Sequence, residues 1–141
     1  MKKVISASLF AAAALFAVGS VSAQTIDLRA DIPFAFHAGK NALPAGQYTV
    51  KQVNGMSGVS HYVLRDQGTG NAVLVLPNSR VMDPKHAYKP AQMVFLCRER
   101  CVLSQIWGGG SDVGIRFRQD LTPREKEAKQ VAILLTSGSA Q

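Results

Sequence analysis

Apolar residues occur along most of this chain in short runs that are separated by turn residues such as Gly, Pro, Asn and Asp. This spacing is typical of β-strands and does not follow the period of a helix. Within residues 47–51, Tyr48 and Val50 alternate with polar neighbours, which predicts a strand with one buried face. The run AVLVL at residues 72–76 is apolar at every position, so we expect a strand that is buried on both faces.

The other apolar runs predict further strands on either side of a long connection. Pro33 is expected to bend the first extended segment, residues 25–39, because proline cannot donate a hydrogen bond to a neighbouring strand. More strands are expected at residues 60–66, 91–97, 101–107 and 114–119. Residues 77–90 contain three prolines and little periodicity, which indicates a connection between sheets with a short strand near Val81.

The C-terminal region carries a helix start signal at residues 122–125. Thr122 can cap a helix, Pro123 suits the first helical position and Glu125 completes a capping box, so a helix is expected to reach about Gln130. Residues 131–136 (VAILLT) fit either a continuation of that helix or a closing strand, and the helix is favoured. The whole pattern predicts an all-β domain, an antiparallel β-sandwich or small barrel of about seven to eight strands with a short C-terminal helix.

Residues 1–23 have the features of a secretory signal peptide. Lys2 and Lys3 precede an apolar stretch at residues 4–18, and a small-x-small pattern ends at Ala23, which predicts cleavage before Gln24. A transmembrane anchor is the alternative, but the apolar stretch is shorter than the roughly 20 residues that a spanning helix needs. Residues 24–141 are therefore expected to form a single periplasmic or secreted domain, with no stable membrane insertion after cleavage.

The chain is basic, with 16 Lys and Arg residues against 9 Asp and Glu residues and a formal net charge of +7. A positive surface favours anionic partners, and an unknown envelope component or an anionic glycan is the expected partner class. Nucleic acid is not expected as a partner, because the basic residues are scattered without a dense run and an exported protein rarely meets it.

Two cysteines, Cys97 and Cys101, flank three charged residues inside an apolar run. If residues 98–100 form the turn of a β-hairpin, Cys97 faces Cys101, and continued pairing places Val94 opposite Ser104. Directly opposed residues lie within disulfide range, and an oxidising compartment favours the bond. We therefore predict a disulfide that fixes the register of the hairpin.

A copper site is the main alternative interpretation of the cysteine pair, since two thiolates and a nearby histidine suit Cu(I). The histidines His37, His61 and His86 are far apart in the sequence and form no local ligand pattern, so no metal or cofactor site is predicted. A thioredoxin-like redox pair needs a two-residue spacer, which is absent from the sequence. Free buried thiols are the last alternative.

Patterns for catalysis are weak, and no catalytic residue is predicted. The sequence contains no G-x-S-x-G motif, and Ser60 and His61 are strand neighbours that point to opposite faces. The aspartates occupy predicted turns and strand edges, although a distant carboxylate pair would suit a small hydrolase. Trp107 could offer a platform on which a sugar ring stacks, but a lone tryptophan at a strand end more often belongs to the core.

Residues 32–50, IPFAFHAGKNALPAGQYTV, resemble the opening of a family of small exported bacterial proteins of uncharacterised function. In that family a signal peptide precedes an IPFxFxxGxxxLPAGxYxV pattern, and a later FL…QIW…G segment and a C-terminal Arg/Glu-rich helix start are also similar. The resemblance covers most of the mature chain. It implies a compact β-domain with no assigned activity, cofactor or catalytic residue.

Together these features favour a non-enzymatic exported module that binds or structures something at the cell envelope. A periplasmic metal-handling protein that uses Cys97 and Cys101 is the first alternative. A small hydrolase with dispersed catalytic residues is the second.

Overall fold

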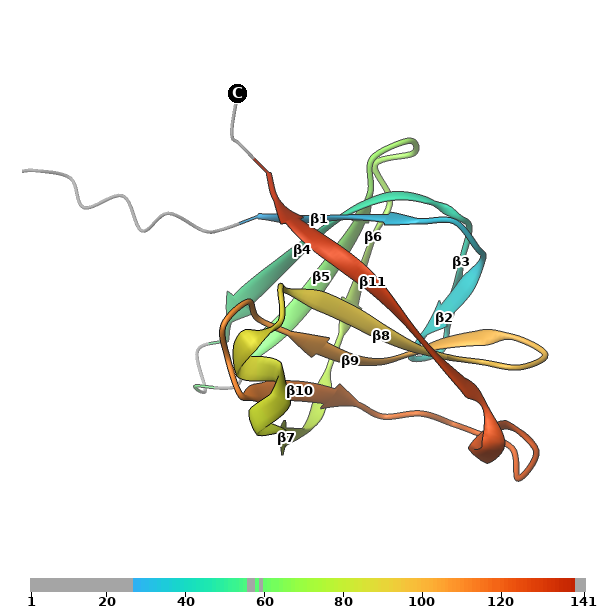
Figure 1. Cartoon of the computed structure of the whole chain (residues 1–141). Coiled ribbons are helices and arrows are strands. Elements are labelled where there is room, and N and C mark those ends of the chain that lie inside the picture. The colour runs from blue at the N-terminus through green and yellow to red at the C-terminus, as the bar shows by residue number, and fades with distance from the viewer. Residues whose placement is uncertain (1–26, 56–57, 59, 139–141) are drawn as a thin grey trace, which may run out of the picture.

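The computed structural model describes residues 27–55, 58 and 60–138, and this part of the chain is built almost entirely from β-strands (Figure 1). The predicted signal peptide at residues 1–23 and its cleavage site lie outside the described residues. Two short 3₁₀ turns are present, η1 (Pro84–Tyr88) and η2 (Glu125–Glu127). The predicted all-β class is confirmed. The strands of the described part are β1 (Leu28–Ile32), β2 (Phe36–Ala38), β3 (Asn41–Leu43), β4 (Gly46–Asn54), β5 (Ser60–Asp66), β6 (Ala72–Val75), β7 (Pro77–Met82), β8 (Gln92–Cys97), β9 (Cys101–Trp107), β10 (Val113–Phe117) and β11 (Lys129–Ser137).

The strands form a nearly closed barrel in which almost all pairs are antiparallel. Neighbouring strands follow the order β9-β8-β11-β1-β4-β5-β6, and β10 joins β9 to β7. Because β7 follows β6 after the single residue Leu76, this pairing brings the sheet almost back to its start. The β2–β3 hairpin adds to β9 by a short parallel pairing. The described part of the chain has eleven strands, more than the seven to eight that the sequence predicts.

The strand β11 joins the two halves of the barrel. Its residues 129–134 pair with β8, and its residues 135–137 pair with β1. Val131, Ile133 and Leu135 are at least half-buried, while the residues between them are exposed, which is the alternation of a strand with one face on the core. The favoured prediction of a helix over residues 131–136 is therefore wrong.

The helix expected over residues 122–130 is also wrong, although its start signal is visible. The Thr122 backbone N–H donates to the Glu125 carboxylate at 2.8 Å, as a capping box requires. However, only one 3₁₀ turn forms before Ala128 returns to an extended conformation. Lys129 then pairs with Cys97, so the pairing of β11 with β8 ends the turn before a second one can form.

Large aromatic side chains gather in the half of the barrel near the β8–β9 turn. The ring of Phe36 meets those of Tyr48 and Phe95 edge to face, with centroids 5.3 and 5.2 Å apart, and Phe34 meets Phe95 in the same way. Burial of each such side chain contributes about 1.5–3 kcal/mol, and the edge-to-face geometry adds to it. Since these rings come from distant parts of the sequence, the cluster ties β2, β4 and β8 together.

The IPFxFxxGxxxLPAGxYxV segment contributes mainly to this core. Ile32, Phe36, Tyr48 and Val50 are each at most 2% exposed. The Tyr48 hydroxyl donates to the Pro44 carbonyl oxygen at 2.6 Å, which fixes the turn that leads into β4. These motif residues therefore serve the fold.

Two predictions about residues 72–90 need correction. The strand expected to be buried on both faces is β6, but Leu74 and the following Leu76 are 55% and 58% exposed, whereas Val75 is buried. A barrel strand turns only alternate residues toward the interior, so the others face outward. Residues 77–82, expected to belong to a connection, form β7, which pairs with β10; the short strand expected near Val81 is therefore present, but it is longer and is part of the barrel.

Candidate binding site at the barrel end

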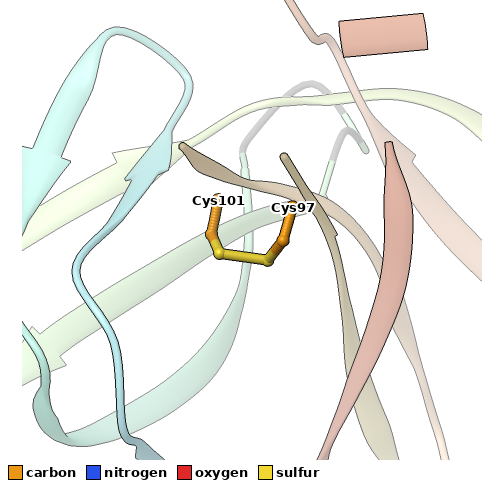
Figure 2. The surroundings of a disulfide bond; sticks show 2 residues. All are labelled: Cys97 and Cys101. Atoms are coloured by element: carbon orange, nitrogen blue, oxygen red, sulfur yellow. A yellow bond between two sulfur atoms is a disulfide. The ribbon is translucent and has the colours of Figure 1, made fainter. Parts of the chain in front are cut away.

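The predicted disulfide is present at the turn between β8 and β9 (Figure 2). Cys97 and Cys101 are directly paired, with their Cα atoms 4.0 Å apart, and the next two pairs of the hairpin also have the predicted register. Both sulfur atoms are committed to the bridge, so they do not act as thiolate ligands. Within residues 27–55, 58 and 60–138, no three His, Cys, Asp or Glu side chains are grouped to hold a metal ion.

One pairing in the hairpin prediction is wrong. Val94 pairs with Gln105 instead of Ser104, because the register shifts by one residue at this point. A β-bulge of this kind re-aims every later side chain of the strand. As a result, Ile106 belongs to the core and Trp107 lies on the outer side of the barrel wall.

The tip of the β8–β9 hairpin is hydrogen-bonded to the segment that precedes β11. Arg100 donates to the Glu125 carboxylate at 2.6 Å, and Glu125 is only 5% exposed. The hydrogen bonds from Arg100 and from the Thr122 backbone lower the pKa of the Glu125 carboxyl to about 2. Arg100 therefore forms a structural clasp with Glu125 at the barrel end that carries the disulfide, which we term the closed end.

Trp107 does not offer an exposed platform for a sugar ring. Its side chain is 2% exposed, and its indole stacks on the His86 imidazole with ring centroids 3.7 Å apart. Gly114 lies so close that a Cβ atom at that position would be 2.5 Å from the indole Cδ2. The indole N–H donates to the Gln105 side-chain oxygen at 2.8 Å. The ring is therefore buried as the core interpretation expects, but it packs under η1 on the outer side of the barrel wall and not in the barrel interior.

His86 is held by hydrogen bonds at both ring nitrogens. Its Nδ1 lies 3.1 Å from the Asp83 carboxylate, and its Nε2 lies 2.9 Å from the Gln92 side-chain nitrogen. The Nδ1-protonated tautomer satisfies both contacts, donating to Asp83 and accepting from Gln92. The pKa of Asp83 is lowered, chiefly by the backbone hydrogen bond from Lys85 and further by His86. These contacts anchor η1 to the barrel wall.

The other residues with possible catalytic chemistry are not brought together into one site. His37 lies in β2 and His61 in β5. The Ser60 hydroxyl donates to the Asn54 side-chain oxygen at 3.1 Å and accepts from the Gln52 amide at 2.9 Å. Ser60 and His61 therefore do not form a dyad, as their strand positions predict.

A pocket of about 480 Å³ opens at the end of the barrel opposite the disulfide. Its wall comes from the ends of β4, β7 and β9 and from the starts of β1, β5 and β10, which meet at the end that carries η1 (Figure 1). We term it the barrel-end pocket. Its apolar wall includes Leu28, Val50, Ile106, Val113 and Ile115.

Cross-strand pairing shows which polar side chains face this pocket. Arg80 pairs with Ile115, which pairs with Ile106, so these three side chains lie on one face of the sheet. Ile106 belongs to the buried core, so this face is the interior. Gln52 and Tyr62 pair across β4 and β5, and both line the pocket. One cation and two uncharged polar groups thus stand beside an apolar wall.

Arg80 lies close enough to Tyr62 for its positive charge to affect the pKa of the tyrosine hydroxyl. Burial raises the pKa of the Tyr62 hydroxyl, and the positive charge of Arg80 opposes that rise. The hydroxyl donates to the Gln52 side-chain oxygen at 3.5 Å, which is a long hydrogen bond. Among the described residues that line the pocket, Arg80 is the only charged one.

A second hollow of about 570 Å³ lies on the side of the barrel, where β1 and β11 separate beyond their paired residues. We term it the side hollow. It is lined by Arg29 and Asp31 on one side and by Ala132 and Leu134 on the other, and Leu134 is 58% exposed. The side hollow is therefore lined by charged side chains of both signs, whereas the only charged side chain among the described residues that line the barrel-end pocket is Arg80.

Sequence reasoning singled out none of the three polar residues Arg80, Tyr62 and Gln52. The apolar pair Val81 and Met82 is a weak strand signal, but only the pairing of β7 with β10 shows that Arg80 faces inward. Comparisons with protein-family models, curated proteins and solved structures found no match to this chain. No helix in the described part of the chain has the length and apolar character needed to span a bilayer.

Proposed function

We propose that this protein is an exported, non-enzymatic binding module that holds a small apolar ligand in the barrel-end pocket. The observation that carries the proposal is the pocket, with its volume of about 480 Å³ and its aliphatic wall. Ligand pockets in proteins typically measure about 300–1,000 Å³ and are mostly apolar. Barrels of about eight strands have interiors that can hold one small ligand.

The packing of the opposite half supports this use of the pocket. The aromatic cluster around Phe36 and Phe95 fills the barrel on the disulfide side, so a ligand would enter from the η1 end. A scaffold that is already ordered before binding loses little conformational entropy when the ligand arrives. The filled half thus provides the rigid base for the open one.

Several observations support export. The leader pattern of residues 1–23 and the resemblance of residues 32–50 to small exported bacterial proteins favour it. The disulfide between Cys97 and Cys101 suits an oxidising compartment. Because both cysteines are bonded and Ser60 is hydrogen-bonded away from His61, no contact among the described residues specifically favours the metal-handling or the hydrolase alternative.

Titration with the neutral apolar dye N-phenyl-1-naphthylamine tests the proposal. The wild-type protein should give a saturable rise in dye fluorescence. Ile115→Trp, which places a larger side chain in the pocket wall, should abolish it, and Val113→Phe near the rim should weaken it. Ala132→Trp places the same large side chain in the side hollow and should bind the dye like the wild type.

Circular dichroism melts establish that each variant is folded before its titration is interpreted. No saturable binding to the wild-type protein would refute the proposal. Dye binding that survives in folded Ile115→Trp but disappears in Ala132→Trp would also refute it, because the ligand would then occupy the side hollow.

A further inference from the structure

The barrel-end pocket is lined by one positively charged side chain, Arg80, at a strand position that faces the barrel interior. Arg80 is paired with Ile115 and shares its face of the sheet, yet the Arg80 side chain is exposed at the rim. Interior positions of small barrels are normally filled by packed side chains. The arginine therefore combines an inward position with a guanidinium group that solvent or a ligand can reach.

The guanidinium of Arg80 has no acidic partner in the described part of the chain. None of the ion pairs there includes Arg80, and no carboxylate is among the described residues that line the pocket. Arg100 shows the contrast, since its side chain is paired with the buried Glu125. A guanidinium group presents five N–H donors and binds carboxylates with two parallel hydrogen bonds, so Arg80 is available for such a group.

Two uncharged polar groups stand on the same side of the pocket as this cation. The Tyr62 hydroxyl is held only by its long contact with Gln52, and the charge of Arg80 acts on it. A hydroxyl in this place can donate to an acidic oxygen. Below these groups the wall is aliphatic, with Val50 and Ile106 buried. The pocket thus combines polar groups that can bind an acidic head with an aliphatic surface that can bind a hydrocarbon tail.

We propose that the barrel-end pocket binds a free, single-tailed amphiphile with an acidic head group, such as a medium-chain carboxylic acid. The head lies at Arg80 and Tyr62, and the tail lies against the aliphatic wall. This inference rests on the proposed function and adds the chemical class of the ligand. Arg80 would repel a cationic amphiphile. A neutral amphiphile would not pair with the Arg80 charge, and the guanidinium N–H groups would stay hydrogen-bonded to water.

Displacement of N-phenyl-1-naphthylamine by ligands with equal tails tests the proposal. Dodecanoate, 1-dodecanol and dodecylamine are compared on the wild type and on two variants with the same charge change, Arg80→Gln in the barrel-end pocket and Arg29→Gln in the side hollow. Dodecanoate should displace the dye about five- to tenfold more effectively than dodecanol, given the strength of partly exposed hydrogen bonds to charged groups. Arg80→Gln should remove this advantage, Arg29→Gln should retain it, and dodecylamine should be the weakest competitor.

The outcomes separate this inference from the proposed function. Suppose that the dye binds but dodecanol competes as well as dodecanoate, or that Arg80→Gln retains the advantage of dodecanoate. The assignment of an acidic ligand is then overturned, and the proposal of an apolar binding pocket is retained. If the advantage disappears in Arg29→Gln alone, the acid binds in the side hollow and the assignment to Arg80 is overturned. If neither the dye nor any dodecyl ligand binds, both proposals fail.

A membrane surface also presents acidic head groups, and co-sedimentation with phosphatidylglycerol vesicles distinguishes it from a free acid. The wild-type protein and Arg80→Gln should sediment equally with such vesicles. Sedimentation that depends on Arg80, together with equal displacement by dodecanoate and dodecanol, would overturn the proposal of a free acid.

Discussion

Replacing Gly114 by alanine should disturb the barrel wall where Trp107 packs. A Cβ atom at Gly114 would lie 2.5 Å from the indole Cδ2 and 2.7 Å from Cε2 and Cε3, whereas carbon atoms in contact are about 3.5–4.0 Å apart. The indole must therefore move by about 1 Å, although it is stacked on His86 and hydrogen-bonded to Gln105. Overpacking costs about 1–3 kcal/mol, and the loss of a glycine from the unfolded chain offsets about 0.4–1 kcal/mol of that. We expect a net destabilisation of about 1–2 kcal/mol.

Urea denaturation followed by tryptophan fluorescence measures this effect directly, since Trp107 is the only tryptophan in the chain. With a slope of about 1–3 kcal/mol per molar urea, the midpoint should fall by roughly 0.3–2 M, and the emission of the folded state should shift to the red. Gly108→Ala is the control, because its Cβ would meet only the Ser111 Cβ, at 4.0 Å. An unchanged midpoint and emission spectrum in Gly114→Ala would refute the inferred close packing of Trp107 on Gly114.

Two further predictions concern the closed end of the barrel, one for the Arg100–Glu125 clasp and one for the disulfide. Glu125→Gln should destabilise the protein at neutral pH, and the difference should shrink as the pH falls from about 4.5 to about 2, because the folded pKa of Glu125 is about 2 and its ordinary value is 4.5. Thermal melts of both proteins across this range check the sign, and a constant difference would contradict it. The double variant Cys97→Ser, Cys101→Ser should lose about 2 kcal/mol of unfolding free energy, the estimate for a very small disulfide loop, with dye binding unchanged. Urea unfolding and dye titration test it, and equal stability or lost dye affinity would speak against a purely structural disulfide.

Features encoded in short segments were predictable from the sequence. The disulfide depends on one turn between Cys97 and Cys101, so the hairpin pattern was sufficient to place it. The capping contact between Thr122 and Glu125 is likewise local, and it formed even though the helix did not. In each case the residues that decide the structure lie within one turn of each other.

Features that depend on pairing between distant strands were not predictable. Both faces of the β8–β9 hairpin are largely apolar, so no alternation revealed the bulge that pairs Val94 with Gln105. Residues 131–136 suit a helix or a strand equally well by local pattern, and their pairing with β8 and β1 decides between the two. The inward position of Arg80 follows only from its register with β10, which no local signal contains.

The unequal filling of the barrel links its fold to its proposed function. Rings of Phe36 and Phe95 reach across the interior at the closed end, whereas Ile106 and Ile115 at the other end are shorter and leave about 480 Å³ open. Apolar surface left in contact with water costs about 25 cal/mol per Å². Larger side chains that filled the pocket would therefore increase the stability of the fold, but they would leave no room for a ligand. A pocket kept open for a ligand therefore implies a trade between stability and binding. Ile115→Trp tests this trade, since a variant that melts no lower than the wild type and no longer binds the dye would show that the open end serves binding and not folding.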